Sequence, residues 1–524
     1  MAFIEVPKWG GGWKNTVLYS LGYILLLLGV ALTVPLVLSF YYGDNPLMFL
    51  IPMAVTLTLG LFISFMFREG EDVLQATSGI LLIGGAFLIM FLVCSIPYII
   101  FGMPVLDSIF ESMSGVTTTG FSMVSDFDSF PQSLFLWRSL TQWIGGVSVL
   151  LVFLYMLPIM GLGGKGFFIN EMSGSGGKNF SNRLKDSVKS FLFIYVLLTI
   201  ILFIVLIFLN TSALDSGCMT LSTVSTGGFM NNAHSLSDYS SAVRAVVVLF
   251  MFLGGTNFYL HFKGIYKGNI VSYVKNTEFR WTLYWFIGIA LLITGLLVNA
   301  SGAMGVNEVL KTLGDSLFTV ISIGTTTGHT VLDYSDLAVW SVPLCATLLM
   351  IVAFVGGMSG STASGVKMYR LVIIGKYIKN TIYKTLHPMA VYDVKVDGSS
   401  VEESSVINAF VTLTLFVLTL GIASVILMVA GMSPEDSLGL AISSASNSGA
   451  ALGSLGPYAA LYTLDPLVKV VMMVVMFLGR LEIATALLFF MPGFWREVGR
   501  NRGGRSRRLR RKKDFNIKRR LDKN

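Results

Sequence analysis

The sequence has little charge for its length, and this scarcity argues against most soluble folds. Only 13% of its 524 residues are Asp, Glu, Lys or Arg, whereas 54% are hydrophobic. An ordinary soluble domain carries about 25% charged residues. A water-soluble globule, a disordered chain and a nucleic-acid-binding domain with basic patches are therefore disfavoured. Cysteine is equally scarce: the three cysteines lie far apart inside apolar runs, which argues against a disulfide scaffold.

The positive charge gathers at one end of the chain. Residues 496–524 contain 14 Lys and Arg against three Asp and Glu, although the whole chain has a net charge of only +8. The remainder is therefore a nearly neutral, apolar body. We expect this basic tail to follow the last membrane span on the inner side and to touch anionic lipid rather than nucleic acid.

Long apolar runs predict a polytopic membrane protein. A helix crosses a hydrocarbon core of about 30 Å with about 20 apolar residues. Ten runs of that length lie near residues 16–41, 46–66, 77–101, 134–160, 190–210, 241–260, 281–299, 337–355, 406–430 and 466–491. The first run is too long for a signal peptide and no small-residue cleavage site follows it, so it is interpreted as a mature helix.

The charges of the connecting loops predict the orientation of these spans. Lys8 and Lys14 precede the first span, and Lys and Arg gather in the loops after the fourth, sixth and eighth spans, whereas acidic residues occupy the alternate loops. With ten spans, both termini then lie in the cytoplasm. The connection 68–72 is the one inner loop without an excess of positive charge.

A fourfold repeat links four shorter apolar stretches, near 104–116, 213–224, 307–322 and 436–446, which are too short to cross a membrane and predict re-entrant helices. Each contains Asp-Ser and a further Ser seven residues after the Asp, and each is followed by a Gly thirteen residues after the Asp. The aspartates are Asp107, Asp215, Asp315 and Asp436; the serines are Ser114, Ser222, Ser322 and Ser443; the glycines are Gly120, Gly228, Gly328 and Gly449. We expect each Asp to cap a short helix and the four together to make the outer mouth negative. A role as an ion ligand is the alternative for each Asp.

The polar stretch that ends at each glycine is a candidate selectivity filter. A helix C-terminus carries partial negative charge, and glycine permits backbone conformations that other residues avoid. Four such stretches can therefore turn their carbonyls toward a common axis and replace the hydration shell of a cation. The candidate filter residues are Thr118, Thr119, Gly120, Thr226, Gly227, Gly228, Thr326, Thr327, Gly328, Asn447, Ser448 and Gly449. The alternative, that these glycines only permit close helix packing, explains neither the Asp nor the fixed spacing.

A second glycine signal follows 26 to 31 residues after each filter glycine, at Gly145-Gly146, Gly254-Gly255, Gly356-Gly357 and Gly479-Arg480. Each repeat thus has the order helix, pore loop, helix. The predicted fold is an all-α polytopic membrane protein with ten transmembrane helices, in which four pseudo-symmetric repeats surround one central pore. The predicted organisation is two N-terminal helices (1–70), pore repeats one (71–165), two (166–268), three (269–376) and four (377–495), and the basic tail (496–524).

The repeats and their glycine segments resemble the Trk/Ktr/HKT superfamily of cation transporters over nearly all of residues 70–497. The segments are Trp143-Ile144-Gly145-Gly146, Gly254-Gly255-Thr256-Asn257-Phe258, residues 356–367 (Gly-Gly-Met-Ser-Gly-Ser-Thr-Ala-Ser-Gly-Val-Lys) and Gly479-Arg480-Leu481-Glu482-Ile483. The two extra N-terminal helices resemble the TrkH branch. The resemblance implies uptake of potassium ions (K+) as the one metal ion, with no cofactor in this chain. It also implies a homodimer, a cytoplasmic nucleotide-binding subunit of the TrkA type, and the plasma (inner) membrane of a prokaryote. Contact with that subunit is an alternative role for the basic tail.

The resemblance also favours potassium over sodium. Relatives of the HKT type that prefer sodium have serine at the position of Gly120. His329 and Ala450, which follow the third and fourth filter glycines, depart from the expected pattern. A sodium-selective or non-selective monovalent cation transporter of the same fold is therefore the alternative.

Residues 356–365 interrupt the eighth span with Gly, Ser and Thr, and such irregular backbone is tolerated at membrane depth only within protein or beside a cavity. The segment resembles the intramembrane gating loop of the family, and a packing kink is the alternative. The candidate gate residues are Gly356, Gly357, Ser359, Gly360, Ser361 and Arg480. A charge at a helix centre costs at least ~2.5–3.5 kcal/mol, so Arg480 is predicted to lie near the axis as a barrier to cations, beside this loop. A salt bridge at the rim of the bundle is the alternative for Arg480, and Glu482 is expected to form a structural pair.

Other classes of function find little support in the sequence. His261 and His387 lack metal-ligand companions, no Walker Gly-Lys-Ser/Thr motif occurs, and no nucleophile–base constellation predicts an enzyme. A carrier that works by alternating access usually shows inverted repeats, whereas these repeats run parallel. Coupling to protons or sodium, as in a symporter, and passive channel-like flow both stay open.

Overall fold

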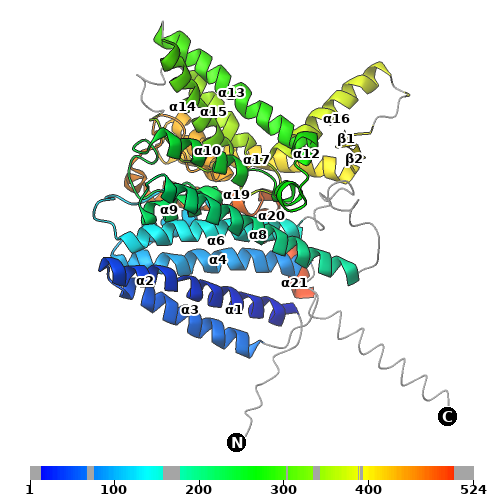
Figure 1. Ribbon diagram of the computed structural model, residues 1–524. Coiled ribbons are helices and arrows are strands. Elements are labelled where there is room, and N and C mark those ends of the chain that lie inside the picture. The colour runs from blue at the N-terminus through cyan, green and yellow to red at the C-terminus, as the bar shows by residue number, and fades with distance from the viewer. Residues whose placement is uncertain are drawn as a thin grey trace, which may run out of the picture.

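The computed structural model describes residues 13–67, 76–156, 178–302, 305–333, 343–387, 389 and 393–500, and within these ranges the regular secondary structure is almost all helix (Figure 1). Most of the basic tail, the inner loop 157–177 and the connection 68–75 lie outside the described residues. The predicted placement of their charges therefore stays a prediction.

The first half of the chain begins with α1 (Trp13–Ala31), α2 (Thr33–Tyr42), α3 (Leu47–Met66) and α4 (Ala76–Phe101). It continues with α5 (Val105–Val116), α6 (Gln132–Met156), α8 (Lys178–Phe208), α9 (Ala213–Val224), α10 (Ser241–Gly254), α11 (Phe258–His261), η2 (Phe262–Tyr266) and α12 (Val271–Lys275). Helices α1, α3, α4, α6 and α8 run side by side (Figure 1).

The second half contains α13 (Thr277–Ser301), α14 (Val306–Gly324), α15 (Pro343–Val355), α16 (Met368–Leu386), α17 (Glu403–Val429) and α18 (Pro434–Ser446). It ends with η3 (Leu461–Thr463), α19 (Pro466–Arg480), α20 (Ile483–Leu487), η4 (Leu488–Phe490) and α21 (Pro492–Arg500). Between α16 and α17, strands β1 (Lys395–Val396) and β2 (Ser399–Ser400) form an antiparallel hairpin.

Seven helices in the described ranges are long and apolar enough to cross a membrane. The number rises to nine if two sharply bent pairs each count as one span: Ser241–Gly254 with Phe258–Tyr266, bent by 103°, and Pro466–Arg480 with Ile483–Phe490, bent by 113°. The apolar helix Leu344–Val355 is shorter, and residues 334–342 before it lie outside the described ranges. The chain is thus a multi-pass helical protein, whereas the number of ten spans stays a prediction.

These two bends differ from the prediction, because the sequence predicts a break only in the eighth span. Both bends fall at the second glycine signal of their repeat. Helix α10 ends at Gly254, and Asn257 starts the next helix by accepting the Tyr259 N–H on its side chain. Helix α19 ends at Arg480, and Glu482 after it has a left-handed backbone with φ 60°. By contrast, α6 continues through its own glycine pair.

The four repeat helices α5, α9, α14 and α18 pack in one cyclic order. Each contacts the two helices that flank it in the chain, and each also contacts the second helix of the repeat before it. These additional neighbours are α19 for α5, α6 for α9, α10 for α14 and α15 for α18. The contacts therefore return from the fourth repeat to the first, while α1 and α3 pack against each other and against α4 outside this circle.

The repeat aspartates do not cap these helices, which corrects the expectation from sequence. Helices α9 and α18 are capped by Ser212 and Ser433, three residues before the Asp, whose hydroxyls accept the N–H of that Asp. Asp107 lies in the first turn of α5, and Asp315 lies in the middle of α14. A serine hydroxyl at the cap reaches the N–H of the third helical residue, and an Asp in the first turn still benefits from the helix dipole.

Candidate functional site

The four repeat glycines meet in a closed ring. A β-carbon built on any of them would lie less than 3.0 Å from a backbone oxygen of the following repeat, a distance that real β-carbons do not adopt. The contacts are Gly120 with Gly227, Gly228 with Thr327, Gly328 with Ser448, and Gly449 with Thr119. Their φ angles are also positive, between 65° and 96°. Both the close approach and the backbone angle therefore require glycine at these four positions, which we call the ring glycines.

The backbone before each ring glycine alternates between two conformations. The residue two positions earlier has a left-handed φ between 51° and 56°: Thr118, Thr226, Thr326 and Asn447. The residue between them does not. Alternation of this kind turns successive N–H groups toward one side of the chain, and the carbonyl groups consequently face the other side.

The repeat serines receive these N–H groups. The residue before each ring glycine donates its backbone N–H to the serine carbonyl at 2.8–3.0 Å: Thr119 to Ser114, Gly227 to Ser222, Thr327 to Ser322, and Ser448 to Ser443. Of the twelve candidate filter residues, Gly227 is the only one whose carbonyl oxygen accepts a hydrogen bond from the described part of the chain. In the same ranges, no group of three or more His, Cys, Asp and Glu side chains is placed to hold a metal ion. The other filter carbonyls are available to a ligand.

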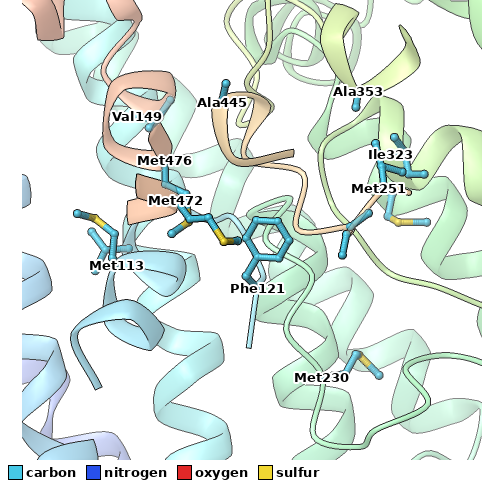
Figure 2. Close-up of a cluster of buried hydrophobic side chains, with 14 of the residues drawn as sticks. Met113, Phe121, Val149, Met230, Met251, Ile323, Ala353, Ala445, Met472 and Met476 are labelled. Carbon is cyan, nitrogen blue, oxygen red and sulfur yellow. The ribbon is translucent and has the colours of Figure 1, made fainter. Parts of the chain in front are cut away.

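The second glycine signal brings the second helices against the ends of the repeat helices. A β-carbon on Gly145 or Gly479 would also lie less than 3.0 Å from a carbonyl oxygen at the end of a repeat helix, that of Val116 for Gly145 and that of Ala445 for Gly479. Close packing is thus the role of these glycines. Buried methionines, among them Met472 and Met476 of α19, pack beside Phe121, the residue that follows the ring glycine Gly120 (Figure 2).

Residues 356–365 form an irregular loop between α15 and α16, and the loop is buried. Gly356, Gly360 and Gly365 have positive φ angles. The ends of the loop nearly touch, since a β-carbon on Gly365 would lie 2.9 Å from the Cα of Gly356. Ser361 is completely buried, and its hydroxyl donates to the Met358 carbonyl at 2.6 Å. The interruption predicted at this position is therefore confirmed as irregular backbone enclosed within the protein.

This loop touches two of the four filter segments. The Ser364 N–H donates to the Thr326 hydroxyl at 3.1 Å, and the Thr226 hydroxyl donates to the Thr362 hydroxyl at 3.1 Å. In the first and fourth repeats, Thr118 Oγ1 and Asn447 Oδ1 are buried and have no hydrogen-bond partner among the described residues. The loop consequently contacts the filter segments of the second and third repeats, and it makes no hydrogen bond to Thr118 Oγ1 or Asn447 Oδ1.

Arg480 lies against the same loop. Its guanidinium donates to the Thr362 carbonyl and to the Ser364 hydroxyl, each at 3.0 Å, and approaches the Gly145 carbonyl at 3.5 Å. The residue is 3% exposed. The ion pairs of the described residues do not include Arg480, so the structure disfavours a salt bridge at the rim. Arg480 thus connects the loop of the third repeat with the second helix of the first.

Glu482 forms the structural pair that the sequence predicts. Its carboxylate lies 2.7 Å from an Arg370 guanidinium nitrogen and 3.9 Å from Lys367 Nζ. Both basic residues follow the loop directly in the chain and are buried. The pair therefore fastens the end of the loop to the bend between α19 and α20.

Glu278, which the sequence pattern does not single out, is a further residue that holds the loop, beside Arg480 and Glu482. Its Oε1 accepts the N–H groups of Ser359 at 2.6 Å and Tyr369 at 3.2 Å. Glu278 lies in the first turn of α13, and the Thr277 N–H beside it donates to Asp397 of the β1–β2 hairpin at 2.8 Å. The signal in the sequence is an acidic residue at the start of an apolar span.

A buried ion pair supports the segments that follow two ring glycines. Glu111 and Arg138 are at most 1% exposed, and Oε1 of Glu111 lies 2.6 Å from Nε of Arg138. Glu111 also accepts the Met123 N–H at 2.6 Å, and Arg138 donates to the Met230 carbonyl at 3.0 Å. The guanidinium carbon of Arg138 lies 4.2 Å from the centre of the Phe229 ring. The pair therefore joins the first and second repeats.

The repeat aspartates are less available to cations than the sequence suggests. Asp107 forms an ion pair with Lys469 at 2.6 Å. Asp436 is buried and accepts the Ser454 hydroxyl at 2.8 Å and the Leu455 N–H at 3.2 Å. These two carboxylates are engaged within the protein, so they contribute less to the expected negative mouth than free carboxylates would.

Residues 63–496 match the family model described as TrkH, cation transport protein. The chain is 28% identical to the Trk system potassium uptake protein TrkH of Halomonas elongata over 92% of this chain and 99% of that protein. It is 27% identical to the protein of the same name from Escherichia coli K12, over 91% and 98%. The crystal structure of the potassium transporter TrkH from Vibrio parahaemolyticus is similar with a TM-score of 0.83 and 26% identity, over 92% of this chain and 99% of that one.

Proposed function

Because the chain belongs to the TrkH family of cation transport proteins, we propose that it takes up potassium ions across the plasma membrane of a prokaryote through one central pore. The family consists of ion transporters, so the chain is not an enzyme. Relatives that match nearly its whole length bear the name of potassium uptake proteins. The pore is formed by the four repeats, and the ring glycines mark its narrowest part.

The observation that carries this proposal is the closed ring of four glycines, in which the backbone N–H groups before the ring glycines point to the side opposite the carbonyl oxygens. Each N–H group before a ring glycine is used by a repeat serine, which leaves the carbonyl oxygens on the opposite side. Carbonyl oxygens from four segments can replace the hydration shell of a monovalent cation. The bound ion is therefore coordinated by the backbone of Thr118–Gly120, Thr226–Gly228, Thr326–Gly328 and Asn447–Gly449.

Uptake of radioactive rubidium into proteoliposomes tests this function. A potassium gradient is set across the membrane, and K+, Na+ and Cs+ compete separately with the rubidium tracer. We expect K+ and Cs+ to compete far more strongly than Na+. Equal competition by Na+ assigns the protein to the sodium or non-selective alternative, and transport that requires a co-transported solute assigns it to the carrier class.

The loop 356–365 and Arg480 form the proposed gate. The loop lies directly against Thr226 and Thr326 of the filter segments, and Arg480 places a buried positive charge beside it. A positive charge on the ion path raises the electrostatic barrier to cations. Replacement of Gly356, Gly357 and Gly360 by alanine tests the loop, and unchanged flux and regulation would contradict the gating role.

The remaining parts of the proposal concern assembly and orientation. We propose a homodimer with a cytoplasmic nucleotide-binding subunit of the TrkA type, and both termini of the chain in the cytoplasm. The hairpin β1–β2 and α16 offer the regulatory subunit a route to the gate, because Asp397 of the hairpin holds the start of α13 beside Glu278. Co-purification of the two subunits, followed by flux measurements with and without nucleotide, tests this part.

A further inference from the structure

One filter segment lacks a side chain that the equivalent positions possess. The residue before the ring glycine is Thr119, Thr327 or Ser448 in three repeats, but Gly227 in the second. In the first and third repeats, this hydroxyl lies 2.7 and 2.8 Å from the hydroxyl of the threonine two positions earlier. The segment before Gly228 cannot make this contact.

Gln142 of α6 occupies the space that Gly227 leaves. Its side chain is fully buried, and a β-carbon on Gly227 would lie less than 3.0 Å from three atoms of the Gln142 amide group. Gln142 Nε2 donates to the Gly227 carbonyl at 2.7 Å, and Gln142 Oε1 accepts the Phe229 N–H at 3.1 Å. The Phe229 N–H can only donate, so it fixes the orientation of the amide. Gln142 thus holds the chain on both sides of Gly228.

No other repeat has a polar side chain at this position of its second helix. Gln142 lies three residues before Gly145, and the equivalent residues are Met251, Ala353 and Met476. Helix α6, which carries Gln142, packs against α9 of the next repeat, just as α10 packs against α14 and α15 against α18. The missing hydroxyl and the additional amide therefore occur at one interface, between the first and second repeats.

We propose that Gln142 and Gly227 form a compensating pair, in which the Gln142 amide replaces the missing side chain and acts as a positioning residue for ion specificity. The proposal rests on the proposed function of the filter. Gly227 is the only one of the twelve filter residues in the described ranges whose carbonyl accepts a protein hydrogen bond. That carbonyl is therefore held in place, and its oxygen presents a weaker electrostatic field to a cation.

A weaker field and a fixed carbonyl both favour the larger potassium ion. Sodium binds its hydration water more strongly, so a site must offer a stronger field, or contract around the ion, to replace that water. Ion selectivity in carbonyl-lined filters is attributed to cavity size and to the field of the carbonyl dipoles, and Gln142 acts on both in the same direction. Removal of the amide should therefore help sodium more than potassium.

The first test replaces the amide by a side chain of the same shape. In Gln142→Met, which copies the residue at the equivalent position in two other repeats, we expect Na+ to compete with rubidium uptake at a several-fold lower concentration. The control Met251→Leu alters packing at the equivalent position of the second repeat and should keep the parent selectivity. The proposal would be overturned if Na+ competition were unchanged in Gln142→Met, or if Gln142→Met and Met251→Leu lost selectivity against Na+ equally.

The second test asks whether the pair compensates. Gly227→Ser places a side chain against the Gln142 amide and should lower rubidium uptake at least tenfold. The double variant Gln142→Ala with Gly227→Ser copies the Ala353 and Ser448 combination found at the equivalent positions, and should recover much of that loss. If the double variant takes up rubidium no faster than Gly227→Ser, the compensation is refuted. This result can be obtained even where Gln142→Met fails to give monodisperse protein. A parent protein that does not prefer potassium refutes the proposed function instead.

Discussion

The closest contact in the ring makes Gly228→Ala the sharpest perturbation of the proposed filter. A β-carbon on Gly228 would lie less than 3.0 Å from the Thr327 carbonyl oxygen, whereas an ordinary contact begins at 3.4 Å. The oxygen belongs to the backbone and the position of the β-carbon is fixed by the backbone, so neither atom can move aside as the end of a flexible side chain would. Alanine must therefore displace one filter segment from the other.

Two terms contribute to the free energy of this substitution. The φ of Gly228 is 81°, and a left-handed conformation costs a residue with a β-carbon roughly 1–2 kcal/mol. Overpacking a rigid site adds typically about 1–3 kcal/mol. The native arrangement of the ring should therefore lose about 2–5 kcal/mol relative to distorted ones, which reduces its population at least tenfold.

The assay is rubidium uptake into proteoliposomes that contain equal amounts of monodisperse protein. We expect Gly228→Ala to lose at least nine-tenths of the uptake rate, and any remaining uptake to discriminate poorly against Na+. Gly295→Ala is the matched control, because Gly295 lies inside α13 with open space around it and no positive φ. Parent rate and selectivity in Gly228→Ala would refute the reasoning that this close approach defines the filter.

Three further predictions concern the gate and the scaffold. Arg480→Ala should raise rubidium flux several-fold in the absence of a regulatory subunit, whereas Arg480→Lys should stay near the parent; unaltered flux in Arg480→Ala would argue against a barrier. Glu278→Ala leaves two loop N–H groups without an acceptor, at about 1–3 kcal/mol each, and should raise basal flux with Na+ competition unchanged; a changed selectivity would place its effect in the filter instead. Glu111→Gln leaves the buried Arg138 charge uncompensated and should destabilise the protein by about 3–5 kcal/mol, which thermal unfolding in detergent measures; an unchanged midpoint would contradict this.

The repeated pattern of Asp-Ser, Ser and Gly predicts much of the site. The positions of the ring glycines follow from a spacing that recurs with four different surroundings, and the irregular loop follows from the Gly, Ser and Thr that interrupt the eighth span. The same pattern misleads at the helix starts, where Ser212 and Ser433 take the capping position three residues earlier. A cap depends on which hydroxyl reaches the free N–H groups, and a repeat of residue types does not report that distance.

The contacts between segments that are remote in the chain are the part that sequence reasoning misses. Gln142, Glu278 and Arg138 each act on a segment that is remote in the chain: Gln142 on Gly227, Glu278 on the loop after α15, and Arg138 on the Met230 carbonyl. Each is a single polar residue in an apolar helix, and its partner is in most cases a backbone group that looks the same in every sequence. Only the tertiary packing of these remote segments selects that partner.

The sequence by itself determined the membrane location, the helical class, the four repeats and the four glycines, because each depends on local composition or on a period along the chain. The tertiary structure decided that the glycines close into a ring, that α10 and α19 bend at the second glycine signal, and that the loop rests on Thr226 and Thr326. It also decided that the Gly227 carbonyl accepts a hydrogen bond from Gln142. These outcomes arise where segments far apart in the chain come within hydrogen-bond distance, and no period along the sequence encodes such a distance.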